Sequence, residues 1–182
     1  TSAPEFALNP IRLELPPAGV LTPNDEHDPL PYYYRPGLGR LYQLRLTMTL
    51  SLLQPAARVL EVGVGSGLVV PTLTTHFPHY TGTDLVLQPG LERLVAPGCD
   101  ARFMQADLLD EGSLPEESFD AIVCVSVLEH IRERGSAARS LARALRRGGR
   151  LVAAYPMVNQ PMSRAFEMIG FLNIDHHHHS SP

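Results

Sequence analysis

Three glycines spaced two residues apart follow an acid in residues 58–68, and this is the stretch best suited to hold a ligand. Glu61 is the acid, and Gly63, Gly65 and Gly67 are the glycines. Without a Cβ, glycine lets backbone N–H groups approach a ligand, and a helix N-terminus that follows favours negative charge and hydrogen-bond acceptors. A tight turn without a ligand is the simpler alternative. It is disfavoured because three such glycines lose much conformational freedom on folding.

A second acid stands where a ribose ligand is expected. Asp84 ends the segment 79–84 and follows Gly63 by 21 residues, close to the roughly 20-residue spacing at which an acid meets ribose hydroxyls in dinucleotide-binding folds. A carboxylate can accept hydrogens from both hydroxyls. Asp84 could also be an ordinary turn residue or helix cap. In combination with the glycine turn, it predicts ribose binding.

Alternating strands and helices must position these residues. Short apolar, β-branched runs predict strands, and apolar residues at helical spacing predict helices. A helix over 39–53, with its apolar stripe at Leu41, Leu44, Met48 and Leu52, precedes the first strand. The pattern predicts a Rossmann-like doubly wound α/β sheet with five parallel strands in order 3-2-1-4-5. The predicted strands are 59–62, 79–84, 101–108, 116–125 and 150–155, and the later helices 66–76, 87–95 and 136–147.

The glycine spacing distinguishes between cofactors. A dinucleotide turn reads G-x-G-x-x-G, but Leu68 stands where the third glycine would be. The observed E-x-G-x-G-x-G resembles motif I of the class I S-adenosylmethionine (SAM) methyltransferases. In that family the glycine turn wraps the amino-acid end of SAM.

Further motifs narrow the resemblance. Leu114-Pro115, Ser118-Phe119-Asp120, Val127-Leu128-Glu129-His130 and the run 145–151 are similar to the type-11 (ubiquinone/menaquinone-biosynthesis-like) branch, over roughly residues 57–156. The resemblance implies SAM as cofactor, with Glu61 organising the glycine turn. It implies that Asp107 accepts from the adenine amino group and Leu108 touches the ring, although Asp107 could instead cap a loop. The other expected cofactor-binding residues are Gly63, Gly65, Gly67, Asp84, Leu85 and Val125.

The C-terminal part departs from the family. Family members resemble one another in a seven-stranded sheet whose last two strands form an antiparallel hairpin, whereas only 26 residues follow Pro156. Either the protein is a short variant or the chain lacks its C-terminus. In both cases strand five becomes an apolar edge that needs covering, and a homodimer is one way to cover it.

The metal and base chemistry of the family is altered as well. Some relatives carry E-x-x-E-H, whose acids and histidine bind Mg²⁺, but Ser126 replaces the first Glu, so we expect no metal. His130 could act as a general base, since imidazole titrates near neutral pH, or could cap the helix start. The run His176–His179 is expected to be a tag residue, a flexible tail or a partner-dependent segment, because adjacent residues do not readily converge on one ion.

The absence of two known motifs narrows the class of methyl acceptor. The chain lacks the [D/N]-P-P-[Y/F] loop of adenine or glutamine N-methyltransferases and the Pro-Cys nucleophile of cytosine carbon-5 enzymes. A small-molecule acceptor with an O-, N- or C-nucleophile remains. The alternatives are a catalytically silent SAM-binding or partner-binding module and a nicotinamide-dependent oxidoreductase.

Residues 1–37 form a proline-rich arm, and 38–182 the SAM-binding domain. Tyr32, Tyr33, Tyr34 and Arg35 suit a lid with apolar rings and polar tips that contacts the substrate. The alternatives are a disordered or surface-draped leader, or tyrosines that fill a groove behind the sheet.

Composition excludes several classes. With a net charge of −4 the protein has no overall positive potential that would attract nucleic acid. The arginines at 132–150 are interpreted as the solvent-exposed face of a helix. Cys99 and Cys124 form no C-x-x-C pair, which fits a reduced, cytoplasmic location. No signal peptide or 18-residue apolar run is present, so no membrane span is expected.

Overall fold

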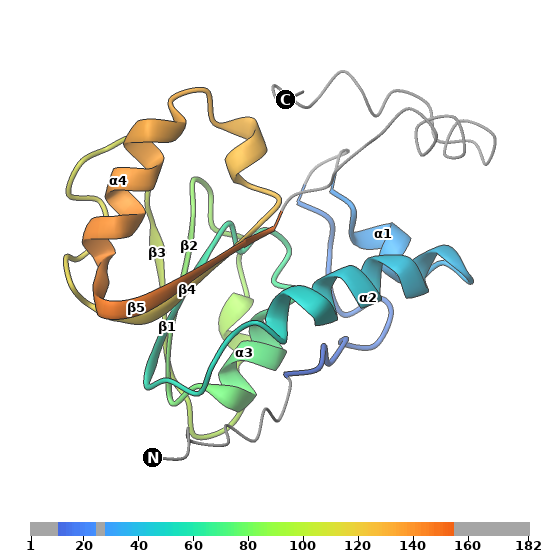
Figure 1. Ribbon diagram of the computed structural model, residues 1–182. Coiled ribbons are helices and arrows are strands. Elements are labelled where there is room, and N and C mark those ends of the chain that lie inside the picture. Colours follow the sequence, from blue (N-terminus) through green and yellow to red (C-terminus); the bar gives the residue numbers. More distant parts are fainter. Residues whose placement is uncertain (1–10, 25–27, 155–182) are drawn as a thin grey trace, which may run out of the picture.

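The computed structural model describes residues 11–24 and 28–154 (Figure 1). Its centre is a five-stranded parallel sheet in the order β3-β2-β1-β4-β5, which confirms the predicted fold class and strand order. The strands are β1 (Arg58–Val62), β2 (His79–Asp84), β3 (Asp100–Gln105), β4 (Phe119–Val125) and β5 (Leu145–Ala154).

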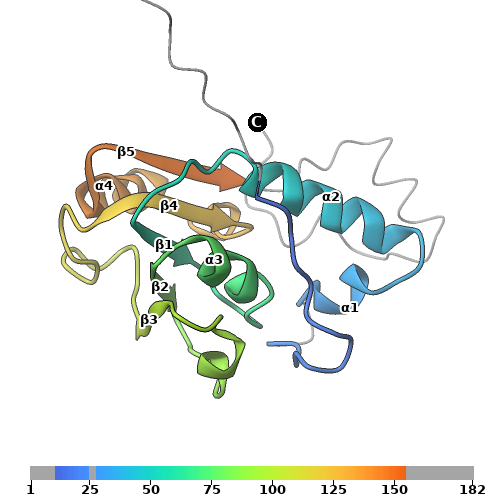
Figure 2. The same ribbon diagram turned by 90° about the horizontal axis from the view of Figure 1, so that it is seen from below.

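Helices cover both faces of the sheet, as Figure 2 shows. One face packs against α2 and α3, with α1 beside α2, and the other face packs against α4. Short 3₁₀ turns, η1 and η2, follow β2 and β4. The helical elements are α1 (Leu30–Tyr33), α2 (Leu38–Leu50), α3 (Val70–His76), η1 (Leu91–Leu94), η2 (Leu128–His130) and α4 (Arg134–Ala144).

The central strands β1 and β4 are mostly apolar because both of their faces are buried. Successive side chains of a strand point to opposite faces. Val59 therefore packs with α2 and α3, while Leu60 and Val62 pack with α4. This arrangement places the carboxyl ends of β1, β2 and β4 at one edge of the sheet, where ligands bind in open α/β sheets.

Several element boundaries differ from the prediction. The segment 87–95, predicted as a helix, forms only the 3₁₀ turn η1 at Leu91–Leu94, and the third strand ends at Gln105 rather than at residue 108. The helix predicted from residue 66 begins at Val70, because Gly65 and Gly67 have φ values of +52° and +83°, outside the helical region. The helix predicted to reach residue 147 ends at Ala144, and the arginine–glycine run that follows belongs to β5. There β5 carries a register irregularity opposite Phe119–Ala121.

The helix α2 forms as predicted, but the apolar stripe that predicted it is exposed. Leu41, Leu44, Met48 and Leu52 are exposed by 62%, 55%, 61% and 58%. Leu46 and Leu50, on the other side of the helix, are buried against the sheet. Periodicity alone could not choose between the two faces, because both are apolar.

The described part of the proline-rich arm contributes to the main core. Ile11, Leu30 and Tyr33 are at most 6% exposed and belong to the cluster that contains Leu46 and Leu50. The expected loss of the C-terminal hairpin and the run His176–His179 lie outside the described residues. Within residues 11–24 and 28–154, none of the helices has the length and apolar content needed to cross a membrane.

Candidate functional site

The glycine turn joins β1 to α3 and is fixed to the end of β2. The Gly63 and Val64 N–H groups both donate to the Thr83 carbonyl, at 2.8 and 3.1 Å. Gly63, at a φ of +79°, has no room for a side chain, since a Cβ would lie 2.2 Å from Cγ2 of Val127. A Cβ on Gly67 would lie 2.5 Å from Cδ1 of Leu94. Close packing therefore requires these two glycines.

Gly65 differs from its neighbours because it faces open space. The nearest atom to a Cβ placed there is Nδ2 of Asn24, at 3.9 Å. The Gly65 N–H donates to Oδ2 of Asp84 at 2.8 Å, and Oδ1 of Asp84 accepts from the Leu85 N–H at 2.7 Å. The structure thus brings Asp84 directly against the middle of the turn, and each carboxylate oxygen keeps a further lone pair for a ligand.

Asn24 is a residue of this region that the sequence did not reveal. Its backbone N–H donates to the Asp28 carboxylate at 2.7 Å, which fixes the segment beside the turn. Its Oδ1 atom is buried and has no hydrogen-bond partner among the described residues. A buried acceptor without a donor is costly, so a donor that a ligand brought within reach of this oxygen would stabilise it. No pattern in the proline-rich arm pointed to it.

Glu61 lies beneath the turn rather than in it. The side chain is 6% exposed, and Oε2 accepts from the Tyr80 hydroxyl at 2.7 Å. Burial raises the pKa of Glu61 to about 8 because it removes water from the charged form, and the nearby Asp84 charge acts in the same direction. The hydrogen bond from Tyr80 opposes this rise only in part. Glu61 therefore joins β1 to β2 directly behind the site.

The end of β3 presents a different arrangement from the one expected. Asp107 is exposed, and its Oδ1 accepts from the Leu109 N–H at 2.9 Å. The Leu108 side chain is 5% exposed and packs in the core on the α4 side. Leu85 and Leu109 are exposed by 58% and 40%. Of the two leucines expected to bind the cofactor, Leu85 is accessible and Leu108, the one expected at the adenine, is not.

Polar groups gather beyond the carboxyl end of β4. After the half-buried Val125, Ser126 has a φ of +56°, and its N–H donates to the Ala154 carbonyl at 2.7 Å. Nη2 of Arg45, from α2, donates to the Ser126 hydroxyl. Within the described part of the chain, the Arg45 Nε is buried without a hydrogen-bond partner, and so are both carboxylate oxygens of Glu129.

His130, the expected base, ends the 3₁₀ turn that follows this segment. Its side chain is exposed, and its N–H donates to the Val127 carbonyl at 3.0 Å. Val127 is also the residue that crowds Gly63. His130 therefore lies three residues along the chain from a direct neighbour of the glycine turn.

The tyrosine cluster packs between α1 and α2. Tyr33 is 5% exposed and meets Tyr42 edge to face, with ring centroids 5.3 Å apart. Burial raises the pKa of Tyr33 to about 12. The Tyr34 hydroxyl donates to the Pro16 carbonyl at 2.9 Å, and the Arg35 guanidinium lies 5.1 Å from the centroid of the Tyr32 ring. These contacts hold the arm together.

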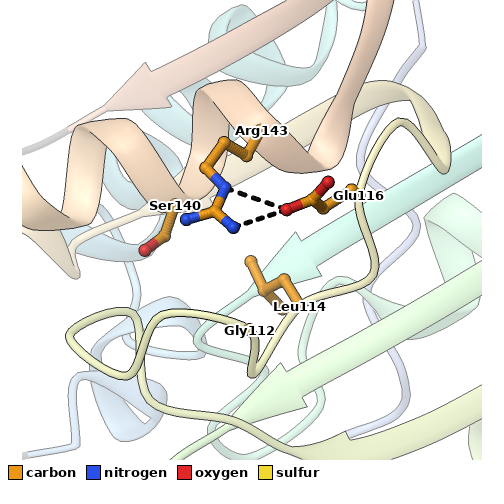
Figure 3. Close-up of a pocket in the computed structure, with 5 residues that line it drawn as sticks. All are labelled: Gly112, Leu114, Glu116, Ser140 and Arg143. Carbon is orange, nitrogen blue, oxygen red and sulfur yellow. Dashed lines mark hydrogen bonds and ion pairs between the residues drawn. The ribbon is translucent and has the colours of Figure 1, made fainter.

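A recess on the α4 side is a poor candidate for a ligand site (Figure 3). It is lined by Gly112, Leu114, Glu116, Ser140 and Arg143. Nε of Arg143 lies 3.1 Å from Oε1 of Glu116, so its two charges already neutralise each other. The Ser140 hydroxyl is also used, because it donates to the Leu108 carbonyl at 2.7 Å.

Comparison with known proteins places the central part of the chain in a family. A family model described as a methyltransferase domain matches residues 60–153. This range contains the glycine turn, Asp84, Asp107 and His130.

Curated relatives carry names from quinone biosynthesis. A ubiquinone biosynthesis O-methyltransferase from Aeromonas salmonicida is 30% identical over 97 residues, which cover 52% of this chain and 41% of that protein. A ubiquinone/menaquinone biosynthesis C-methyltransferase from Pseudomonas putida is 30% identical over 149 residues, covering 74% and 56%. The chain spans about half the length of the curated relatives it matches.

Solved structures agree in fold. A DhpI–SAM–HEP complex superposes with a TM-score of 0.56 at 20% identity, covering 77% of this chain and 64% of that one. A complex of the Haloferax volcanii Trm112 methyltransferase activator with a methyltransferase gives 0.51 at 18% identity, covering 63% and 53%. At these identities the likeness shows the fold alone. Together with the family match over half of the sequence, it means that the chain belongs to the class I SAM-dependent methyltransferases, in the type-11 branch.

Proposed function

We propose that this chain binds SAM across the glycine turn and the Asp84 carboxylate and transfers its methyl group to a small-molecule acceptor. The observation that carries the proposal is the contact between Gly65 and Asp84, at 2.8 Å, on the open side of the turn. Open space for the amino-acid end of SAM and an acceptor for its ribose hydroxyls are thereby adjacent. SAM supplies a methyl group already activated by its sulfonium, so the protein has mainly to position the reactants.

The groups around the turn fit the methionine end. Gly65 leaves space for close approach, and Oδ1 of Asn24 is an acceptor without a donor. The α-ammonium of SAM is such a donor. Asn24 would thus hold the ammonium, and the turn containing Gly63, Gly65 and Gly67 would lie against the methionine end of SAM, because Gly65 leaves room for close approach. Glu61 would organise the turn from beneath, through its contact with Tyr80.

The adenosine end would lie along the ends of β2 and β3. Asp84 would accept the ribose hydroxyls, and Asp107 the adenine amino group. Leu85 is sufficiently exposed to touch the ring. Leu108 is not, so the exposed Leu109 is the better partner at that position. Val125, at the end of β4, would line the inner wall.

The acceptor would approach from the end of β4. His130 would take the acceptor proton as general base, and the Arg45–Ser126 pair would shape this side of the site. The names of the relatives include both O- and C-methylation, so a small acceptor with an oxygen or carbon nucleophile is favoured over one with a nitrogen. The arm of residues 1–37 would close the site over Asn24, with Tyr32–Arg35 supporting it.

Calorimetry and methyl transfer test the proposal in sequence. The full chain should bind SAM and its product S-adenosylhomocysteine, and should show no comparable affinity for NAD. Labelled SAM should then transfer its methyl group to phenolic quinone precursors, and His130→Ala should lower kcat while SAM still binds. A folded chain without SAM affinity would refute the proposal. SAM binding without transfer to any acceptor would favour the silent module.

A further inference from the structure

A row of exposed apolar side chains lies along the outer side of α2, at the periphery of the described fold (Figure 2). The residues follow one another at intervals of three or four positions along α2 and the turn after it, and side chains at this spacing share one side of a helix. The members of this α2 row are Leu41, Leu44, Met48 and Leu52, each more than half exposed. A contiguous exposed apolar patch normally marks an interaction surface.

Three polar residues of α2 leave the row uninterrupted because their side chains are turned toward the protein. Gln43 donates through Nε2 to the Tyr33 carbonyl at 2.8 Å. The buried Thr49 donates its hydroxyl to the Arg45 carbonyl at 2.9 Å. Nη2 of Arg45 donates to the Ser126 hydroxyl beyond the end of β4. The outer side of the helix therefore remains apolar between Leu41 and Leu52.

The surroundings of the row are positively charged, although the whole chain has a net charge of −4. Residues 29–57 contain three arginines and no acid. α1 and β5, which both contact α2, contain no acid either. Arg35 and Arg40 are exposed, and neither forms an ion pair with a residue of the ranges 11–24 and 28–154. Two cations without a counter-charge therefore stand at the N-terminal end of the row.

This combination suits the surface of an anionic lipid bilayer. Helices that lie in the plane of a membrane interface bury an apolar side at the boundary of the acyl chains, and arginines beside it reach the phosphate groups. The ring centroid of Tyr32 lies 5.1 Å from Cζ of Arg35, and tyrosine is enriched at the level of the lipid head groups. A lipid surface requires no complementary groove, so the convex side of one helix is sufficient.

A second copy of the chain is the main rival, and the charge around the row disfavours it. A two-fold symmetric contact brings the same surface of both copies together. Each Arg40 would then approach another positively charged surface, and α1, α2 and β5 offer no acid to pair with it. Like charges that face each other across an interface oppose association. An anionic head group supplies the counter-charge that a second copy lacks.

We propose that the α2 row, together with Arg35 and Arg40, docks the protein on the surface of an anionic lipid bilayer. The apolar side chains of the row insert between the head groups, and the two arginines pair with lipid phosphates. The contact is peripheral and uses one side of one helix. It does not depend on the proposed methyl transfer.

Sedimentation with lipid vesicles tests the electrostatic part of the contact. The full chain should bind phosphatidylglycerol-containing vesicles at least about tenfold more tightly than pure phosphatidylcholine vesicles, since each arginine near an anionic surface contributes about fivefold. Raised salt should weaken this preference. Arg35→Gln with Arg40→Gln should remove most of it. Arg102→Gln is the matched control, because it neutralises an exposed arginine on β3, at the far edge of the sheet, and should leave the preference unchanged.

Substitutions within the row test the apolar part. Leu44→Ser with Met48→Ser should weaken binding to the same vesicles at least about tenfold, because the apolar surface that inserts is lost. Both side chains are exposed, so folding and SAM binding should not change. Val86→Ser, at a position 65% exposed outside the row, should bind vesicles as the wild type does. The chain contains no tryptophan, so Leu41→Trp should report insertion by a blue shift and by protection from acrylamide when vesicles are added.

Failure of the folded full chain to bind the anionic vesicles would overturn the proposal. Binding that survives Leu44→Ser with Met48→Ser would do the same. An indole at residue 41 that is already protected without vesicles would mean that protein covers the row: a second copy if the protection is lost on dilution, and another part of the same chain if it is not. All of these results come from vesicle binding or fluorescence, so they stand whether or not the chain binds SAM or transfers its methyl group.

Discussion

The Asp84 carboxylate accepts the Gly65 N–H at 2.8 Å, so the acid at the end of β2 supports the turn that follows β1. Its other oxygen accepts from the Leu85 N–H. The same side chain is therefore placed to shape the glycine turn and to receive a ligand. Substitutions of Asp84 should affect both the stability of the turn and the binding of a ligand. The choice of replacement residue can separate these two effects.

Asp84→Ala should weaken SAM binding at least about tenfold, since hydrogen bonds to a charged group contribute about 1.5–3 kcal/mol. It should also lower the melting temperature, because the Gly65 and Leu85 N–H groups lose their acceptor. Asp84→Asn keeps one acceptor oxygen and should restore most of the stability but little of the affinity. Calorimetry and thermal unfolding of both variants measure this. Normal SAM affinity in Asp84→Ala would refute the ribose assignment.

Asn24→Ala should weaken SAM binding by roughly tenfold through loss of one acceptor for the ammonium. Binding of 5′-methylthioadenosine, which lacks the amino-acid end, should not change. Asp84→Ala is the matched control, because it should weaken both ligands. If Asn24→Ala weakened both ligands equally, Asn24 would be supporting the turn rather than contacting the methionine end.

Glu61 should make the fold less stable as pH rises. Its carboxyl titrates near 4.5 in the unfolded chain and at about 8 in the fold. Between these values unfolding releases a proton, so the free energy of unfolding falls by up to about 1.4 kcal/mol for each pH unit. The stabilisation is complete below the lower value and is lost as pH passes the upper one. Glu61→Gln still accepts from Tyr80 but does not titrate.

Denaturant unfolding of the wild type and Glu61→Gln between about pH 5 and pH 8 tests this slope. The difference between their unfolding free energies should shift steadily in favour of the variant as pH rises. Parallel curves would mean that the buried carboxyl does not control this pH dependence. Tyr80→Phe is a useful companion, because it removes the hydroxyl and keeps the ring.

Much of the sheet could be predicted from the sequence because its central strands are buried on both faces. β2 was predicted over its observed residues, and β1 to within one residue. The glycine turn and Asp84 were brought together as expected. Both signals are local, since each depends on residue types within one short segment.

The remaining features depend on tertiary contacts. α2 is apolar on both sides, so the sequence could not say that Leu46 and Leu50 would face inward. Leu108 and Leu109 are adjacent leucines, and only the packing of α4 determines which of them is buried. Asn24 lies in a proline-rich segment without periodicity, and its place beside Gly65 follows from the path of the arm.

Alanine substitutions at Gly63 and Gly65 should have different effects, the first on stability and the second on SAM binding. Gly63→Ala would put a Cβ 2.2 Å from Cγ2 of the half-buried Val127 and would hold alanine at a φ of +79°, so the fold should be destabilised more than by Gly65→Ala. Gly65→Ala meets no atom closer than 3.9 Å and should cost about 1–2 kcal/mol for its positive φ. Gly65→Ala should remain folded yet lose SAM binding, as circular dichroism and calorimetry would show. Unchanged SAM affinity in folded Gly65→Ala would contradict the role of this turn.

Deleting residues 1–37 should collapse the domain rather than open a lid, because the deletion removes three members of the main core. Ile11, Leu30 and Tyr33 are at most 6% exposed, and Tyr33→Ala alone should cost about 3–5 kcal/mol by analogy with other buried aromatics. Covering of the site is better tested within the intact arm. Asn24→Ala should leave stability nearly unchanged and weaken SAM binding, whereas Tyr33→Ala should lower the melting temperature. If deletion of 1–37 left a folded, SAM-binding domain, the arm would be dispensable to the core, and the burial of Tyr33 would be of little energetic consequence.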